Sequence, residues 1–209
     1  MPLICLFGPD GSGKSTLAKI LAKRLSDEGF RVRVRWMRGT HTLASILAKL
    51  LSKFNTFKGP ANPYYSITIP SELRRLWQLI EFFSAIPIIL LKFILPSLLG
   101  FHVIAERYTP DLITWISLVT NDKHYLRRLE ARFLLALASK ASPRIYVIAS
   151  LEELLRRDKN MKADFIKSQL ELYESISKAI GAKTLDTTGR NVNESLDEIL
   201  DYLGNSASG

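Results

Sequence analysis

The chain has 209 residues, of which 47% are hydrophobic and 23% charged, a composition typical of a folded globular protein. Its single cysteine, Cys5, excludes a disulfide framework within the chain, and no basic segment precedes the first apolar run, so we expect a cytoplasmic protein without a signal peptide. The net charge of +9 permits binding to nucleic acid or anionic membranes, but the sequence contains no nucleic-acid motif, and nucleic acid is not an expected partner.

The first predicted strand, Leu3–Phe7, is followed by a loop and by a helix predicted over 17–28 from the spacing of its apolar residues. The loop matches G-x-x-x-x-G-K-[ST], the phosphate-binding loop of ATP- and GTP-using proteins. Its glycines let backbone N–H groups turn toward phosphate oxygens, and the helix N-terminus adds partial positive charge. Lys14 is expected to reach the β- and γ-phosphates, and the Ser15 hydroxyl to bind Mg²⁺. The predicted ATP-binding residues are Gly8, Pro9, Asp10, Gly11, Ser12, Gly13, Lys14, Ser15 and Thr16.

Further apolar runs along the chain are predicted to be strands, and helical patterns separate them. These runs are Val32–Trp36, Val103–Ala105, Ile145–Ile148 and Thr184–Leu185. Such alternation predicts an α/β fold with a mostly parallel, doubly wound sheet of five strands. The segment 56–70 is predicted to be a loop, because it carries three prolines together with Asn and Gly.

The stretch from Phe82 to Ala105 is strongly apolar. Lys92 interrupts it, and it also contains Pro87, Pro96 and Gly100, so no charge-free run reaches the roughly 20 residues that a membrane span requires. We expect a buried helix followed by a strand, with part of the helix facing a partner subunit or an apolar acceptor pocket. Membrane contact is not expected.

A second motif follows the strand within that stretch. Glu106 and Arg107 stand at its carboxyl end, where ligands collect in open α/β sheets. The Glu106 carboxylate could hold Mg²⁺ or accept a proton from an acceptor group, and Arg107 could grip an acceptor phosphate through a bidentate fork. The alternative is a surface Glu–Arg pair without a function.

At these two motifs the chain resembles the thymidylate kinase family of nucleoside-monophosphate kinases. Residues 7–16 are similar to the family's E-G-x-[DE]-G-x-G-K-[ST]-T, and residues 96–109 to its P-A-L-x-x-G-x-x-V-I-x-D-R-Y-x. Weaker similarity covers 34–40, where the family has T-R-E-P-G-G-T, and 185–189. The resemblance implies a P-loop kinase fold with helices on both faces of the sheet. It also implies a single domain over 1–209, a short lid at about 150–163, and a homodimer packed through the apolar helices.

The resemblance also implies roles for individual residues. Asp10 would contact the sugar hydroxyl of the acceptor, and Arg107 would bind the acceptor phosphate. Glu106 stands where the family has Asp and would lie near Mg²⁺. Arg35 and Arg38 are equal candidates for a further contact to the acceptor phosphate, depending on how the eroded stretch 34–40 is aligned.

Family members need a cation beside the transferring phosphoryl group, either in the phosphate loop or in the lid. Gly11 follows Asp10 here, so the lid must supply the cation. Arg156, Arg157 and Lys159 are the candidates, because charge stabilisation provides most of the catalysis in phosphoryl transfer. The alternative is a solvated helix with Glu–Arg pairs at helical spacing.

Several departures from the family bear on the acceptor. Phe7 replaces an acidic residue, and the helix before Pro96 lacks the Arg that contacts the nucleotide in the family. Phe82 or Phe83 could stack on a base there, although a core role is the alternative.

The predicted activity is therefore Mg²⁺-dependent transfer of the ATP γ-phosphoryl group to a nucleoside monophosphate, most simply dTMP to dTDP, without a covalent enzyme intermediate. One alternative is a kinase for a nucleoside, a sugar or a lipid-like alcohol, in which Glu106 or Asp10 would act as general base. Another is a nucleotide-dependent regulatory ATPase. A GTP switch is not expected, because the sequence lacks N-K-x-D.

Overall fold

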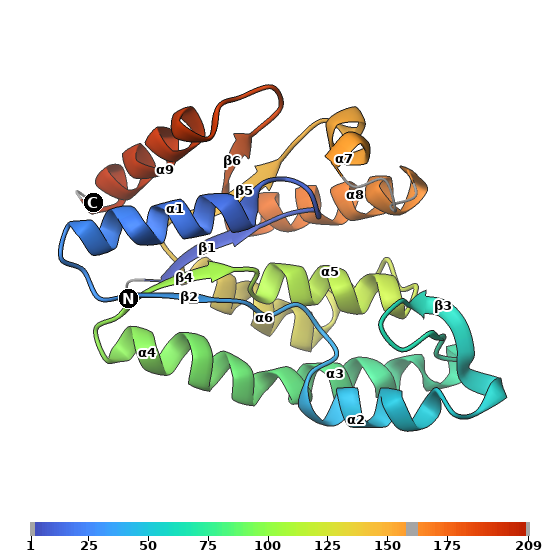
Figure 1. Cartoon of the computed structure of the whole chain (residues 1–209). Coiled ribbons are helices and arrows are strands. Elements are labelled where there is room, and N and C mark those ends of the chain that lie inside the picture. Colours follow the sequence, from blue (N-terminus) through green and yellow to red (C-terminus); the bar gives the residue numbers. More distant parts are fainter. Residues whose placement is uncertain (1–2, 158–162, 208–209) are drawn as a thin grey trace.

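The computed structural model describes residues 3–157 and 163–207. Its centre is a five-stranded sheet in which every neighbouring pair of strands is parallel (Figure 1). The strand order is β2 (Val32–Arg35), β4 (His102–Glu106), β1 (Leu3–Phe7), β5 (Arg144–Ile148) and β6 (Lys183–Asp186). The sequence-based prediction of a parallel α/β sheet is confirmed; the first predicted strand coincides with β1, and each of the others differs by at most one residue at either end.

Helices connect the strands and cover both faces of the sheet (Figure 1). They are α1 (Lys14–Asp27), α2 (Thr42–Leu51), α3 (Arg74–Ile88), α4 (Leu95–Leu98), α5 (Thr109–Val119), α6 (Leu129–Ser139), α7 (Leu151–Arg157), α8 (Ala163–Ile180) and α9 (Val192–Ala207). Single 3₁₀ turns occupy η1 (Asn55–Phe57), η2 (Ser71–Leu73) and η4 (Tyr125–Arg127), and η3 (Ile89–Ile94) is π-helical.

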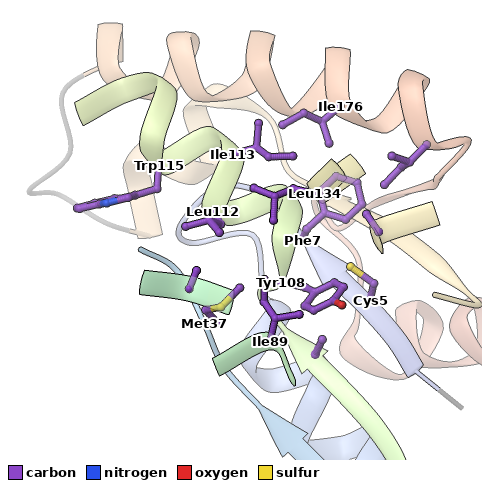
Figure 2. Close-up of a cluster of buried hydrophobic side chains, with 14 of the residues drawn as sticks. Cys5, Phe7, Met37, Ile89, Tyr108, Leu112, Ile113, Trp115, Leu134 and Ile176 are labelled. Atoms are coloured by element: carbon purple, nitrogen blue, oxygen red, sulfur yellow. The ribbon is translucent and has the colours of Figure 1, made fainter. Parts of the chain in front are cut away.

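The side chains of β1 alternate between two hydrophobic cores, as expected for a strand that is buried on both faces. Ile4 and Leu6 pack toward α1 and α9. Leu3, Cys5 and Phe7 pack into the larger core that α3, α5, α6 and α8 form on the other face (Figure 2). Because β1 is covered on both faces, the loop at its carboxyl end is held by the most buried part of the sheet.

Helices α3 and α4 join through η3 into one helical stretch over Ser71–Leu98. Pro87 lies inside α3 and cannot donate a backbone hydrogen bond, and the π-helical turn begins two residues later, consistent with a local change in hydrogen-bond pattern. The expectation of a buried helix is correct for one face only: Ile89 and Phe93 are buried, whereas Leu91 is 64% exposed.

The prediction of a loop over 56–70 is wrong in part. Residues Lys58–Asn62 form a short strand, β3, that pairs antiparallel with Ile67 outside the main sheet. Here Thr68 Oγ1 would lie 2.1 Å from a Cβ at Gly59, so glycine permits the two segments to approach closely. Turn residues mark a change of direction, but they do not reveal which segments pair across it.

The orientation of the α3–α4 helix predicts losses of stability of different size for two truncations. Replacement Phe93→Ala removes a fully buried ring that contacts Tyr108 at a centroid distance of 4.9 Å. It should lower the free energy of unfolding by about 3–5 kcal/mol. Leu91→Ala, two residues away on the outer face, should cost less than about 1 kcal/mol. Urea unfolding of both variants measures the difference, and equal costs would contradict this orientation.

Candidate active site

The phosphate-binding loop leaves β1 at Gly8 and enters α1 after Gly13. Gly8 has φ +142°, and a Cβ at this position would lie 2.2 Å from the Val147 carbonyl oxygen on β5. Gly13 has φ +90° and caps the N-terminus of α1. Glycine is therefore required at both positions, because other residues would be strained there and would also clash at Gly8. The loop wraps around the helix N-terminus as the motif predicts.

The side chain of Lys14 lies inside this loop. It is 4% exposed, and its Nζ donates hydrogen bonds to the Pro9 carbonyl oxygen and to Ser12 Oγ, the latter at 3.0 Å. Burial, followed by the positive charge of Arg107, lowers the pKa of Lys14 to about 7. Phosphate oxygens would stabilise the charged form, so this position suits an anionic ligand.

Ser15 and Glu106 meet between the start of α1 and the end of β4. The Ser15 hydroxyl donates a hydrogen bond to Glu106 Oε1. Parallel pairing of β1 and β4 places Glu106 opposite Leu6, two residues before the phosphate loop. A hydroxyl and a carboxylate beside a phosphate-binding loop are the oxygen ligands that Mg²⁺ prefers, so these two residues are suited to hold the ion.

Arg107, the next residue, is buried and has φ +99°, a conformation that is unusual for arginine. Its guanidinium donates hydrogen bonds to Asp10, to Asp111 Oδ1 at 2.7 Å and to the Gly8 carbonyl oxygen at 3.4 Å. Burial alone would lower the pKa of Arg107, but the carboxylates of Asp111 and Asp10 outweigh it and raise the pKa. The guanidinium is therefore held as a cation within the site.

Sequence reasoning missed Asp111, which lies in the first turn of α5 and is 1% exposed. Its Oδ1 also accepts a hydrogen bond from Tyr173 of α8 at 2.8 Å, and its Oδ2 accepts one from the Tyr108 backbone at 3.2 Å. A carboxylate four residues after Arg107 at a helix start was the available signal.

Asp10 brings a second arginine to the same place. Its carboxylate forms an ion pair with Arg38 at 2.8 Å, in addition to its contact with Arg107. Burial would raise the pKa of Asp10, but Arg107 and Arg38 lower it. The Arg38 guanidinium lies 5.3 Å from the ring centre of Trp115, and the Tyr64 ring stacks on that tryptophan at 5.1 Å.

Arg35 lies elsewhere. It is the last residue of β2, opposite Ala105 of β4, and its guanidinium donates to the neighbouring Val34 carbonyl oxygen at 3.4 Å. Of the two arginines that the sequence left as equal candidates, Arg38 is therefore the one joined to Asp10.

A buried polar network orients the turn that carries Arg38, and sequence reasoning missed it as well. Glu81 of α3 accepts hydrogen bonds from the Thr40 backbone N–H at 2.6 Å and from its Oγ1 at 2.7 Å. Trp115 Nε1 donates to Thr40 Oγ1 at 2.9 Å, and a Cβ at Gly39 would lie 1.9 Å from the Trp115 ring. Burial raises the pKa of Glu81.

Phe82, which the sequence offered as a residue that could stack on a base, packs its ring against Phe83 and Phe133.

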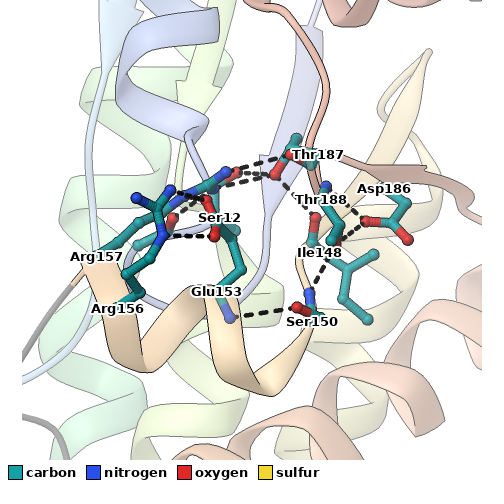
Figure 3. Close-up of polar contacts among 10 residues, drawn as sticks. Ser12, Ile148, Ser150, Glu153, Arg156, Arg157, Asp186, Thr187 and Thr188 are labelled. Carbon is teal, nitrogen blue, oxygen red and sulfur yellow. Dashed lines mark hydrogen bonds and ion pairs between the residues drawn. The ribbon is translucent and has the colours of Figure 1, made fainter.

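The described part of the predicted lid contains two of its candidate cations, Arg156 and Arg157, which both pair with Glu153 but differ in exposure and in their other contacts (Figure 3). Arg157 donates to the Gly11 carbonyl oxygen at 2.9 Å and to Thr187 at 3.2 Å, so it is docked on the phosphate loop. The Arg156 side chain is 74% exposed and pairs with Glu153. Lys159 and the rest of the predicted lid over 158–162 lie outside the described residues.

A cavity of about 420 Å³ opens beside the loop. It is lined by Asp10, Gly11, Gly13, Lys14, Ser15, Thr16, Leu17, Arg107, Arg157, Thr187, Arg190, Val192 and Ser195. The loop therefore forms one wall, Arg107 borders it, and Arg157 with the segment after β6 lies along the other side. Such a cavity is of the size and polarity expected for a nucleotide.

Removal of the Asp111 carboxylate should destabilise the folded protein, because it leaves the buried Arg107 guanidinium with one ion-pair partner fewer. Asp111→Ala should lower the free energy of unfolding by about 3–5 kcal/mol. Tyr173→Phe removes one hydrogen bond to the same carboxylate and should cost about 1 kcal/mol. Denaturant unfolding at neutral pH compares the two variants. Similar small losses for both would mean that the buried ion pair is not formed.

Comparisons with known proteins agree with this geometry. Residues 4–91 match the model of a family described as "ATPase family associated with various cellular activities (AAA)", a match that contains the phosphate loop. The chain is 26% identical over 202 residues to a probable thymidylate kinase of Methanocaldococcus jannaschii, covering 95% of this chain and 93% of that protein.

Among solved structures, the thymidylate kinase from Ehrlichia chaffeensis matches with a TM-score of 0.58 and 15% sequence identity, covering 97% of each chain. At that identity the likeness establishes the fold. The match with the M. jannaschii protein extends beyond the phosphate loop, over nearly the whole chain. The chain is therefore built on the P-loop kinase fold and is similar, over nearly its whole length, to a probable thymidylate kinase.

Proposed function

We propose that this protein transfers the γ-phosphoryl group of ATP to a nucleoside monophosphate, with dTMP as the expected acceptor. The observation that carries the proposal is the meeting of two sets of residues at the carboxyl ends of β1 and β4. Lys14 with the Ser15–Glu106 pair forms a phosphate- and metal-binding side, and Asp10 with Arg107 and Arg38 forms a second, cationic side. The whole-length similarity to a probable thymidylate kinase supports the same function.

On the donor side, the backbone N–H groups of the loop and the Lys14 ammonium would bind the β- and γ-phosphates of ATP. In the structure, Lys14 Nζ donates to the Pro9 carbonyl oxygen and to Ser12 Oγ within the loop, and phosphate oxygens of a bound nucleotide would replace these acceptors. Mg²⁺ held by Ser15 and Glu106 would supply further positive charge next to the transferring group. The thirteen residues that line the cavity leave room for the rest of the nucleotide.

On the acceptor side, Arg107 would hold the phosphate of the monophosphate in line with the ATP γ-phosphorus. A phosphate oxygen of the acceptor then forms the new P–O bond while the bond between the γ-phosphorus and the β–γ bridging oxygen breaks, and ADP leaves. A phosphate monoester has its second pKa near 6, so at neutral pH the attacking oxygen has no proton to lose. This reaction therefore requires positioning and charge rather than a general base.

The state of the two carboxylates favours a phosphate acceptor over a hydroxyl acceptor. A hydroxyl needs a base, and Asp10 or Glu106 would have to provide it. Asp10 is paired with both Arg107 and Arg38, which lower its pKa, and Glu106 accepts the Ser15 hydroxyl. Asp10 is thus a weak proton acceptor, and the Glu106 carboxylate is already engaged by the Ser15 hydroxyl.

The decisive test is an acceptor panel. The protein is incubated with Mg-ATP and with dTMP, dUMP, the other monophosphates or thymidine, and the transferred phosphate is counted beside a Lys14→Ala control. We expect dTMP to yield a diphosphate, and the control to lose at least about a hundredfold in rate. Phosphorylation of thymidine alone, or ATP hydrolysis that no acceptor stimulates, would contradict the proposal.

The lid supplies a matched pair of variants for the same assay. Arg157→Ala removes the guanidinium docked beside Gly11 and should lower kcat by about 10²–10³-fold, because charge on the transferring phosphoryl group loses its counter-charge. Arg156→Ala removes an exposed guanidinium and should change kcat by less than about threefold. The reverse order would assign the catalytic cation to Arg156 instead.

A further inference from the structure

A short hairpin places an aromatic side chain next to the candidate acceptor side. It runs from Lys58 to Ile67, is here called the β3 hairpin, and lies beside α5 outside the main sheet (Figure 1). Near its turn, the Tyr64 ring stacks on Trp115 of α5, with ring centres 5.1 Å apart and an angle of 27° between the ring planes. The donor, metal and phosphate contacts of the proposed function leave this hairpin without a role.

The β3 hairpin is anchored at its base and exposed at its turn. Ile67 is fully buried in a small core with Trp77 of α3. Asn62 is 2% exposed, and its Nδ2 donates a hydrogen bond to Thr40 Oγ1 at 3.2 Å. Tyr64 itself is 54% exposed, and its backbone N–H donates to Asn62 Oδ1 at 3.1 Å. The Tyr64 ring can therefore move on a fixed base, because its displacement uncovers little of the buried core.

Trp115, the other member of the stack, is held in place beside the residues that would bind the acceptor phosphate. It is 3% exposed and lies four residues after Asp111, the buried partner of Arg107. The two side chains therefore lie on the same side of α5, about 6 Å apart along its axis. Arg38 connects the same two places, because its guanidinium pairs with Asp10 at 2.8 Å and lies 5.3 Å from the Trp115 ring centre. A phosphate on Arg107 thus has an aromatic surface one helical turn away.

We propose that Tyr64 and Trp115 bind the base of the acceptor nucleotide between their rings, and that the turn of the β3 hairpin moves outward to admit it. This inference rests on the proposed function, which assigns the phosphate of that acceptor to Arg107. A base between the two rings needs ring centres about 7 Å apart, twice the contact distance of roughly 3.5 Å between carbon atoms. The exposed Tyr64 ring would therefore move by about 2 Å, while the buried Trp115 ring stays in place.

The chemistry of this pair selects an aromatic acceptor. Stacking on an aromatic side chain improves the binding of a base by roughly five- to 150-fold. A sugar phosphate or an aliphatic alcohol has no ring to place between Tyr64 and Trp115. Because every base has a π-face, the pair would separate nucleotides from other phosphate esters, and would distinguish one base from another only weakly.

The competing explanation is that Tyr64 acts only through Arg38. Arg38 Nη1 donates a hydrogen bond to the Tyr64 hydroxyl at 3.4 Å, so the tyrosine could hold this guanidinium toward Asp10. Loss of Tyr64 would then weaken the binding of any phosphate ester, whether or not it carries a base. A sugar phosphate without a base separates the two explanations.

Isothermal titration of the full-length protein with dTMP and with deoxyribose 5-phosphate, which lacks the base, tests the proposal. Tyr64→Ala should weaken dTMP binding at least about tenfold and change the binding of deoxyribose 5-phosphate less than about threefold. Tyr64→Phe keeps the ring and should recover most of the lost dTMP binding, whereas Tyr64→Leu, of similar bulk, should bind dTMP about tenfold more weakly than the unchanged protein. In the kinase assay, Tyr64→Ala should raise KM for dTMP and leave KM for ATP within about twofold, since other residues line the cavity beside the phosphate loop.

Three results would overturn the proposal. They are unchanged dTMP binding by Tyr64→Ala, tighter dTMP binding by the same variant, which would mean that Tyr64 blocks the site, and equal weakening of both ligands, which would assign the effect to Arg38. All three leave the proposed function standing, whereas failure of the unchanged protein to bind dTMP contradicts both. Circular dichroism establishes that each variant is folded. If Tyr64→Ala does not fold, or if the sugar phosphate binds too weakly to measure, the contrast between Tyr64→Phe and Tyr64→Leu decides.

Discussion

The buried guanidinium of Arg107 is the interaction on which the candidate site depends. It joins four separate parts of the chain: Asp10 from the phosphate loop, the end of β4, Asp111 from the start of α5 and, through that carboxylate, Tyr173 from α8. In a low-dielectric environment each of these charges is tolerable only because the others are present. The network therefore sets the distance between the phosphate loop and the residues proposed to hold the acceptor, which is the preorganisation that phosphoryl transfer needs.

The candidate active site and the exposed apolar side of the α3–α4 helix lie at different places on the sheet. The candidate active site is at the carboxyl ends of β1 and β4, where the backbone leaves the sheet and polar side chains can converge. The α3–α4 helix lies over one face of the sheet (Figure 1), and its outer side exposes apolar side chains such as Leu91 and Leu98. Its inner side packs in the same core as Phe7, the residue that precedes the phosphate loop.

Local patterns predicted the parts of this protein that local forces determine. The strands β1, β4 and β5 were recognised as apolar runs, because burial on both faces removes the polar alternation, and the phosphate loop was recognised because its geometry requires glycine. Contacts between distant segments were not predicted. Glu81 with Thr40 and Asp111 with Tyr173 are separated by 41 and 62 positions, and nothing in either neighbourhood indicates the partner. The Thr40–Glu81 contact helps to orient the turn that brings Arg38, rather than Arg35, to Asp10.

By itself the sequence determined that this chain forms a parallel α/β sheet with a phosphate loop after its first strand, because periodicity and backbone chemistry are properties of neighbouring residues. Only the tertiary structure decided which charges meet. It paired Arg107 with two carboxylates and turned Arg157 toward the loop and Arg156 toward solvent. It also left one side of the apolar helix exposed. The physical reason is that ion pairs and burial depend on distance in space, which chain order alone does not specify.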